Sequence, residues 1–437
     1  MTTEVLILGG GYTAVWAARR LVRDLRRSGR HRDVRVTLVS ATPTHAFHGW
    51  TAEVITGHVR LERTLTPLAE LLPDVRVLTG VAAEVDLDRR EVAVADADGM
   101  TRLRYDQLVL GVGSRDACER VPGLADHGFT TKGDGQLARL TTHLDEVVAR
   151  AASTADEAER ARLLTVVVAG GGFAGVETAV AVRQRLVATV ARHASLAGWR
   201  PEVLLVHAGP ELLPSLRPRF ARVAEHAGRQ VGLAGVQVRC GTRLTSVRAS
   251  GVTLTGPDDP ETVGAATVIS TLGQAPVAMP GTESLTRDAG GRLVVDRQLR
   301  VQREGRVVEG VWAGGDLAAV PHPSGSGVCP SSALWAIYHG ELAGTNVARS
   351  IRGRGPRPFR FPGLGQAASF GVGEASAELA GVPLLGWSGW LARWVLFHYY
   401  MPSRTVAGRT ILEWCRPGRR QSSPVEVGCF DRIPVSR

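Results

Sequence analysis

Lysine is nearly absent from this chain of 437 residues, because Lys132 is the only one although lysine and arginine together number 52. Almost all of the positive charge is therefore arginine, for which genomic base composition is the simplest explanation. The net charge of +10 is compatible with nucleic acid, an anionic membrane face or phosphate-bearing ligands as partners. The distribution of charge along the chain has to decide between them.

Cysteine is also scarce, and its five copies form no CxxC pair: Cys118, Cys240, Cys329, Cys415 and Cys429. This pattern excludes a CxxC dithiol and a four-cysteine zinc site, and it is typical of a reducing cytoplasm. The histidines include no HExxH motif, and we predict no metal site.

Long hydrophobic runs are missing, since no stretch of 18 apolar residues occurs. The N-terminal residues lack the basic region and small-residue cleavage site of a signal peptide. We therefore expect neither a membrane-spanning helix nor a leader, and a cytoplasmic protein. At 44% apolar and 22% charged residues, the chain is globular and long enough for two or three domains.

One pattern of strand, glycine turn, helix and strand occurs twice. The first copy is predicted at Glu4–Leu8, Gly9–Gly11, Tyr12–Leu25 and Val34–Val39, and the second at Leu164–Ala169, Gly170–Gly172, Val176–Ala191 and Glu202–Val206. Such a unit is the core of a Rossmann-like dinucleotide-binding domain. The sequence thus predicts an α/β protein with two such domains and two nucleotide sites. Alternating segments near residues 91–105 and 252–254 predict a small antiparallel sheet in each.

The first glycine turn has the spacing Gly9-x-Gly11-x-x-Ala14. Gly9 suits a tight turn, Gly11 lets the backbone approach a pyrophosphate, and Ala14 lets the helix pack on the strand. The following strand ends at Ser40, where an acidic residue would bind ribose hydroxyls. A serine hydroxyl binds ribose more weakly than a carboxylate does.

The second turn, Gly170-x-Gly172-x-x-Gly175, is complete, and its second strand ends at His207. A carboxylate there would accept two ribose hydroxyls and repel a 2′-phosphate, whereas histidine does neither. This favours tolerance of NADPH or preference for it. The alternative is a degraded nicotinamide site, or one that binds NADH through other contacts.

A third element, GVWAGGD at Gly310–Asp316, predicts a strand that delivers Asp316 beside a helix start. Taken alone, such a turn has no specific meaning. Together with two dinucleotide folds and the strand segment YDQLVLGVGS at Tyr105–Ser114, it indicates a carboxylate placed for the ribityl hydroxyls of a flavin.

These motifs, with VTLVSATPTHAFHGWTAEVITG, GGGFAGVETA, GPELLPSL and VWAGGDLA, resemble those of flavoproteins with two dinucleotide-binding domains. Within that group the chain is similar to the type II NADH dehydrogenases, which are single-subunit NADH:quinone oxidoreductases. The resemblance covers nearly the whole chain. It implies FAD on the first fold, NAD(P)H on the second, and hydride transfer to the flavin followed by reduction of an acceptor.

The resemblance and the two turns together give the candidate site residues. Those for FAD are Gly9, Gly11, Thr13, Ala14, Ser40, Gly113, Gly315, Asp316 and Ala333, and those for the nicotinamide cofactor are Gly170, Gly172, Gly175 and His207. Glu177 matches the family's glutamate near flavin and nicotinamide, which makes it a candidate catalytic residue. Its other interpretation is a carboxylate that stabilises a helix N-terminus.

The helix after the Asp316 turn departs from the family, because Leu334 and Tyr338 occupy the positions of two glutamines that line the quinone pocket. This favours an acceptor other than the usual membrane quinone, with Tyr338 and His339 as candidate catalytic groups. Ordinary helix packing would also explain Tyr338. The alternative functions are a flavin dehydrogenase or oxidase of specialised biosynthesis that acts directly on a small molecule, and a flavoprotein without catalysis.

The C-terminal section follows a predicted linker at Arg352–Pro362 and holds eight arginines against three acids in residues 387–437. Its apolar segment Trp387–Met401 is too short to span a bilayer. Peripheral membrane contact and a homodimer interface both fit it, whereas dispersed arginines argue against nucleic acid. We expect an FAD domain from 1–122 and 270–345, an NAD(P)H domain from 123–269, and a C-terminal dimerisation or membrane-facing domain from 346–437.

Overall fold

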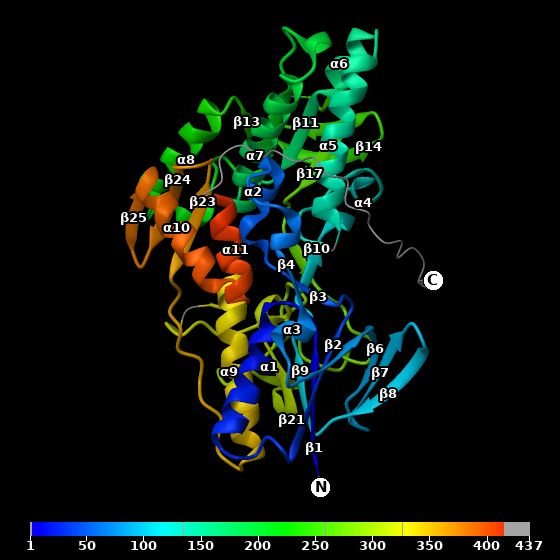
Figure 1. Ribbon diagram of the computed structural model, residues 1–437, viewed down its shortest axis with the longest axis vertical. Helices are drawn as coiled ribbons and strands as arrows, with labels where there is room; N and C mark the ends of the chain where they lie inside the picture. Colours follow the sequence, from blue (N-terminus) through cyan, green and yellow to red (C-terminus); the bar gives the residue numbers. More distant parts are fainter. Residues whose placement is uncertain (1, 134, 258, 326, 415–437) are drawn as a thin grey trace.

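The computed structural model describes residues 2–133, 135–257, 259–325 and 327–414. Two sheets form the cores of two neighbouring units, with the C-terminal elements packed beside the upper one (Figure 1). The predicted α/β fold with two dinucleotide-binding folds is confirmed. Cys415, Cys429 and five of the eight arginines in residues 387–437 lie outside the described residues.

The first sheet has the strand order β20-β21-β9-β1-β2-β5 and is parallel except for β20. Its strands are β1 (Thr3–Leu8), β2 (Val34–Ser40), β5 (Arg76–Thr79), β9 (Gln107–Leu110), β20 (Arg300–Arg303) and β21 (Arg306–Ala313). Strand β1 is buried from Val5 to Leu8, which explains why it is an unbroken apolar run in the sequence.

Helices α1 (Tyr12–Arg27) and α9 (Ala333–Ile351) lie side by side on this sheet (Figure 1). Their backbones approach closely because α9 carries Gly340 and Gly344 at the contact. A Cβ on Gly340 would overlap the carbonyl oxygen of Thr13, and one on Gly344 would overlap that of Ala17. This contact fixes the N-terminal turn of α1 against the later part of the chain.

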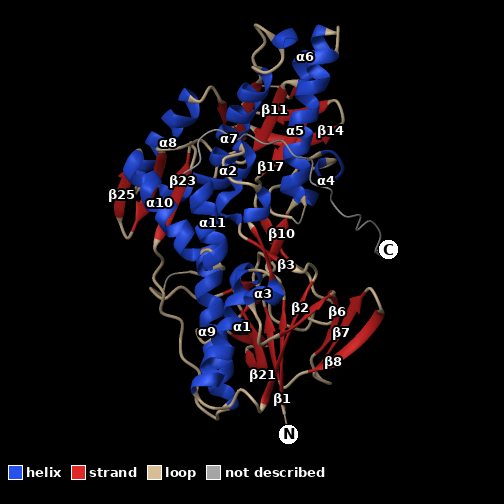
Figure 2. Cartoon of the chain, viewed as in Figure 1, coloured by secondary structure: helices blue, strands red, loops and turns tan. Residues whose placement is uncertain are grey.

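The second sheet is fully parallel in the order β13-β12-β11-β17, and helices cover it (Figure 2). Its strands are β11 (Thr165–Ala169), β12 (Glu202–His207), β13 (Gln237–Cys240) and β17 (Thr267–Ser270), and its helices are α5 (Gln136–Ser153), α6 (Glu157–Leu163), α7 (Phe173–Val190) and α8 (Ala221–Leu233). Helix α7 begins three residues before the predicted Val176, because the chain turns helical directly after Gly172, its N-cap.

The two small antiparallel sheets expected from sequence are present as β6–β8 and β14–β16. Their bounds are β6 (Val81–Asp86), β7 (Glu91–Asp96), β8 (Gly99–Arg104), β14 (Arg243–Arg248), β15 (Gly251–Thr255) and β16 (Glu261–Gly264). Three short pairs join β3 (Thr44–Ala46) to β4 (Leu65–Pro67), β10 (Ser114–Asp116) to β18 (Gln274–Pro276), and β19 (Leu293–Val294) to β22 (Ala318–Ala319). The short helices are α2 (Thr51–Thr56), α3 (Leu68–Leu71) and α4 (Leu124–His127).

The C-terminal section combines a three-stranded sheet with two helices. Its elements are β23 (Gly365–Ser369), β24 (Ala375–Leu379), β25 (Val382–Leu385), α10 (Trp387–Tyr400) and α11 (Arg404–Trp414). Trp414 packs 5.7 Å from Trp390 and 5.8 Å from Trp50 of the first unit, measured between ring centroids. Within the described ranges, no helix has the length and apolar character needed to cross a bilayer.

Candidate active site

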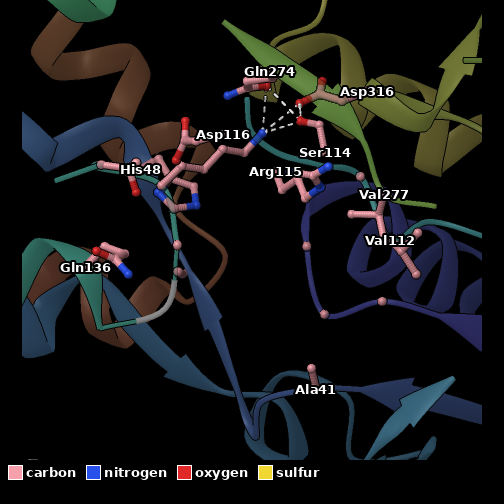
Figure 3. Close-up of a pocket in the computed structure, with 18 of the residues that line it drawn as sticks. Ala41, His48, Val112, Ser114, Arg115, Asp116, Gln136, Gln274, Val277 and Asp316 are labelled. Atoms are coloured by element: carbon pink, nitrogen blue, oxygen red, sulfur yellow. Dashed lines mark hydrogen bonds and ion pairs between the residues drawn. The ribbon is translucent and has the colours of Figure 1, made fainter. Parts of the chain in front are cut away.

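A large cavity lies at the carboxyl ends of the strands of the first sheet and extends to the second unit. Its empty volume is about 2620 Å³, part of which is open to solvent. Ligands of open α/β sheets bind at this end of the strands. Figure 3 shows Ser114, Gln274 and Asp316 close together in this cavity. Glu177 and Thr178 of α7 line it from the second unit.

The first glycine turn forms one wall of the cavity and leads into α1. Gly9 has a φ of 116°, and a Cβ on it would lie 2.5 Å from the carbonyl oxygen of Gly111. Gly11 is the N-cap of α1 and lines the cavity, where a Cβ would meet no atom within 4 Å. The bare backbone and the positive end of the helix dipole therefore face the cavity together.

The other predicted FAD residues lie around the same space. Gly9, Gly11, Thr13, Ser40, Gly113, Asp316 and Ala333 line the cavity. Ala14 is buried beneath the turn. Gly315 has a φ of 66° and packs against Thr13, where a side chain would overlap the threonine hydroxyl. The structure thus brings together residues separated by more than 300 positions in sequence.

Lys132 joins this group, although sequence reasoning gave it no role. Its Nζ lies 2.8 Å from Asp316 Oδ2, 2.7 Å from Ser114 Oγ and 2.8 Å from Gln274 Oε1. The ammonium group thus donates to three oxygens from three segments of the chain. The sequence signal that could have identified Lys132 is that it is the one lysine among 52 lysine and arginine residues. It lies in the cavity.

Glu177 lies where the two units and the C-terminal section meet. Its Oε1 accepts a hydrogen bond of 2.7 Å from the backbone N–H of Ser369 and lies 3.0 Å from Nη2 of Arg393. Burial raises the pKa of Glu177 to about 6, and the Arg393 guanidinium opposes this shift. A carboxyl group with such a pKa exchanges protons near neutral pH. Arg393 and its other partner, Glu53, were missed by sequence reasoning.

Tyr338 and His339 do not line the cavity. The ring of Tyr338 stacks on Phe361 at 3.8 Å, and its hydroxyl lies 3.1 Å from that of Tyr400. Nδ1 of His339 accepts a hydrogen bond of 3.1 Å from the backbone N–H of Gly315. Burial lowers the pKa of His339 to about 3, which keeps the ring neutral as this bond requires. His339 therefore supports the turn that carries Asp316.

The second glycine turn repeats the geometry of the first. Gly170 has a φ of 118°, and a Cβ on it would lie 2.5 Å from the carbonyl oxygen of Thr271. Gly172 faces open space, and Gly175 is buried in α7. Nδ1 of His207 accepts a hydrogen bond of 3.2 Å from the backbone N–H of Gly171. His207 thus lies directly beneath the turn.

Both turns fit a dinucleotide. At Gly11 and at Gly172 a side chain would enter open space instead of protein atoms, so the backbone at each is accessible to a phosphate. The larger cavity has the volume for the remainder of an FAD. Two dinucleotide folds with a shared cavity between them define a flavin-dependent oxidoreductase that uses a nicotinamide cofactor.

Comparison with known proteins agrees with this class. The chain belongs to the pyridine nucleotide-disulphide oxidoreductase family, whose model matches residues 3–340. It is 27% identical over 406 residues to the demethylphylloquinone reductase NdbB of Synechocystis, covering 92% of each chain. It is 28% identical to the type II NADH:quinone oxidoreductase NdhA of Mycobacterium tuberculosis, over 90% of this chain and 82% of that protein.

The fold is also that of NDH2 from Plasmodium falciparum, whose structure was solved in complex with NADH. The TM-score is 0.83 at 12% identity, and the alignment covers 95% of this chain and 98% of the other. The protein is therefore an FAD-dependent NAD(P)H oxidoreductase of the type II NADH dehydrogenase kind. Among the described cysteines, Cys118, Cys240 and Cys329 are free.

Proposed function

We propose that the protein transfers hydride from NAD(P)H to FAD and passes the electrons on to a quinone. The observation that carries this proposal is the shared cavity, which Glu177 of the second fold lines together with Gly11 and Asp316 of the first. A nicotinamide held on the second fold can thus reach a flavin held on the first. FAD supplies the redox chemistry when bound, and the chain positions both dinucleotides.

We assign each candidate residue a role consistent with its position. The N-terminus of α1, with Gly9, Gly11, Thr13 and Ala14, would hold the FAD pyrophosphate, and Ser40 the adenosine ribose. Asp316 would accept the ribityl hydroxyls, while Gly113 and Ala333 leave room for the ring system. Gly315 would let the turn that carries Asp316 pack against Thr13. Gly170, Gly172, Gly175 and His207 would hold the nicotinamide dinucleotide, and Glu177 would manage a proton beside the reacting rings.

The acceptor is where the chain departs from its family. Leu334 and Tyr338 have no side-chain amide that could bind a quinone carbonyl. The Tyr338 ring stacks on Phe361, and its hydroxyl bonds that of Tyr400. Both observations favour an acceptor other than the usual membrane quinone. By contrast, the relatives in Synechocystis and Mycobacterium tuberculosis are named as a quinone reductase and a quinone oxidoreductase, which favours a quinone as the acceptor. We therefore propose a quinone bound without side-chain amides from α9.

The second candidate function is direct oxidation of a small molecule by the flavin, with no use of NAD(P)H. The observation that favours it is His207, because no carboxylate ends strand β12 to bind ribose hydroxyls. Under this alternative, the second fold would retain its architecture without binding a dinucleotide productively.

Anaerobic mixing of the FAD-loaded protein with NADH or NADPH separates the two candidates. Rapid bleaching of the flavin absorbance supports the first function, and no bleaching by either nucleotide eliminates it. The reduced protein is then mixed with soluble quinones, dioxygen and dyes. Reoxidation by quinones faster than by dioxygen supports the proposed acceptor, and reoxidation by dioxygen or dyes alone contradicts it.

We also propose the division into an FAD domain (1–122 and 270–345), an NAD(P)H domain (123–269) and a C-terminal domain (346–437). The first is supported by β20 and β21 completing the N-terminal sheet. Exposed apolar side chains of the third, Trp387, Val395, Tyr399 and Leu412, support peripheral membrane contact, with a homodimer as the alternative. Sedimentation of native lysate at low salt tests this, and complete recovery in the supernatant argues against membrane contact.

A further inference from the structure

Arg393 of α10 is buried between the two dinucleotide folds, with a side chain only 2% exposed. Its guanidinium binds Glu53 of α2 through two bonds, 2.7 Å from Nη1 to Oε1 and 3.3 Å from Nη2 to Oε2. Nη2 also lies 3.0 Å from Glu177 Oε1 and 3.1 Å from the carbonyl oxygen of Gly49. One cation of the C-terminal section therefore contacts one carboxylate from each fold.

The surroundings of this cluster are largely apolar. The guanidinium carbon lies 4.3 Å from the ring centroid of Phe397 and 5.6 Å from that of Trp50. The side chain of Glu53 is 6% exposed and that of Glu177 is 20% exposed. Of Glu53, Arg393 and Glu177, only Glu177 lines the large cavity assigned to FAD, called the flavin cavity below. Glu177 is therefore the one charged side chain of the cluster that can exchange a proton with the cavity.

The charges of the cluster do not cancel. Two carboxylates share one guanidinium, so the fully ionised cluster has one negative charge in excess in an apolar environment. A buried charge that lacks a partner is strongly destabilising. Binding one proton removes the excess, since two carboxylates in one site do not both ionise easily.

Other titratable groups near the cluster do not change this balance. On α10, His398 bonds the carbonyl oxygen of Trp394 through Nδ1, and burial lowers its pKa. His48, before α2, lines the cavity, and burial lowers its pKa to about 4. Glu53 is the only charged residue of α2, and β23 has none. On α7, Arg185 is paired with Asp145.

We propose that Glu53, Arg393 and Glu177 form a one-proton store beside the flavin, in which Arg393 and Glu53 are positioning residues that set the pH at which Glu177 binds its proton. This inference rests on the proposed function, which requires such a proton. A hydride from NAD(P)H brings two electrons and one hydrogen, and an acceptor that gains two hydrogens takes one further proton. The store supplies that proton and is refilled from solvent.

The test is the pH dependence of the midpoint potential of the bound flavin, measured anaerobically with dithionite and mediators in the absence of NAD(P)H. The wild-type holoenzyme should show a break near pH 6, because ionisation of Glu177 alters the charge beside the flavin. Glu177→Gln should abolish the break. Glu53→Gln removes one negative charge and should move the break down by about one unit, whereas Arg393→Met removes the cation and should move it up by at least as much.

The double variant Glu53→Gln with Arg393→Met restores the excess of one negative charge and should return the break toward the wild-type pH. Arg185→Met is the matched control, because it disturbs the contact of α7 with α2 at the Ile55 carbonyl and leaves the cluster charge unchanged. The proposal would be overturned if the break moved in the same direction in Glu53→Gln and in Arg393→Met. Should Arg393→Met not fold, Glu53→Gln decides alone, and an unmoved or raised break overturns the proposal.

The two proposals fail in distinguishable ways. If NADH and NADPH leave the flavin oxidised while the breaks move as expected, the proposed function is wrong, and only the control of Glu177 protonation by Arg393 and Glu53 stands. If the flavin is bleached by NAD(P)H while the breaks do not move, the function stands and the store is rejected.

Discussion

At the scale of single residues, the charge of the flavin cavity depends on a few side chains that meet from distant parts of the chain. Lys132 illustrates this, because its ammonium group contacts Asp316, Ser114 and Gln274 at once. A guanidinium is planar and fixed in geometry, whereas an ammonium directs three donors around one point. In a chain whose other cationic residues are arginines, we expect arginine to replace this lysine only in part.

Replacing Lys132 with Met should weaken the retention of FAD. Asp316 would lose its cation and its fixed orientation, and hydrogen bonds to charged groups contribute about 1.5–3 kcal/mol each. We expect the dissociation constant of FAD to rise by roughly tenfold or more, as 1.4 kcal/mol corresponds to a factor of ten. Fluorescence of released FAD measures this. Lys132→Arg should recover only part of the affinity, and full recovery would contradict the geometric argument.

Replacing His207 with Glu should shift the nucleotide preference toward NADH. The new carboxylate would accept two ribose hydroxyls and repel the 2′-phosphate of NADPH. We expect the ratio of kcat/KM for NADH to that for NADPH to rise by about tenfold or more, given a few kcal/mol for charged hydrogen bonds. Steady-state kinetics with both nucleotides measures the ratio. An unchanged ratio would show that His207 does not read the ribose.

Glu177 should make the stability of the fold depend on pH. Burial raises its pKa from 4.5 to about 6, so the folded state binds this proton more tightly than the unfolded state. The stabilisation is complete below pH 4.5 and is lost as the pH rises through about 6. The unfolding free energy of Glu177→Gln, relative to wild type, should therefore increase by about 1.5 kcal/mol between pH 4.5 and pH 6.5, out of roughly 2 kcal/mol for the full pKa shift. Denaturant unfolding at pH 4.5 and 6.5 measures it, and a decrease would refute the sign.

At the scale of elements, the contact of α1 with α9 holds the phosphate turn in place. Gly340→Ala should destabilise the protein by about 1–3 kcal/mol, because its Cβ would overlap the backbone of Thr13 and force the helices apart. Thermal unfolding measures the loss, and FAD affinity should fall with it. Gly228→Ala in α8, where a Cβ meets no atom, is the control and should stabilise by about 0.5–1 kcal/mol. Equal effects of the two substitutions would contradict this view.

The elements themselves were largely predictable, because their signals are local. Strands β1, β2 and β12 coincide with apolar runs of the sequence. Each phosphate turn begins at the residue directly after its strand. The predicted start of α7, Val176, is three residues late. The glycines of the turn indicate a loop up to Gly175, whereas the helix begins at Phe173, directly after its N-cap Gly172.

The composition of the site was only partly predictable. The glycine turns and Asp316 are carried by short motifs, whereas Lys132 meets Asp316 across 184 positions and Arg393 meets Glu53 across 340. No local pattern marks such pairs. Tyr338 is a candidate because it occupies the position of a glutamine in the family, and His339 because it is the polar residue beside it. The packing of α9 places Tyr338 against Phe361 and His339 at Gly315.

At the scale of the whole molecule, FAD would connect segments that are far apart in sequence, from Gly11 to Asp316 and Ala333. Binding to the folded state alone adds stability in proportion to the logarithm of the ligand concentration. Free FAD at 100 times its dissociation constant should add about 2.7 kcal/mol, seen as a rise in Tm across graded FAD. Asp316→Ala should need a higher FAD concentration for the same rise. A Tm independent of FAD would show that the cavity does not hold it.

The solitary lysine has a further consequence for chemical modification. Amine-directed reagents, and acylation of lysine side chains in the cell, normally spread over many surface positions of a protein. Here the only side-chain amine is Lys132, which lies in the cavity assigned to the cofactor and is held by Asp316. Acylation would remove its charge. Lysine labelling of this protein therefore reports on the accessibility of a single position, and a ligand that covers Lys132 should slow it.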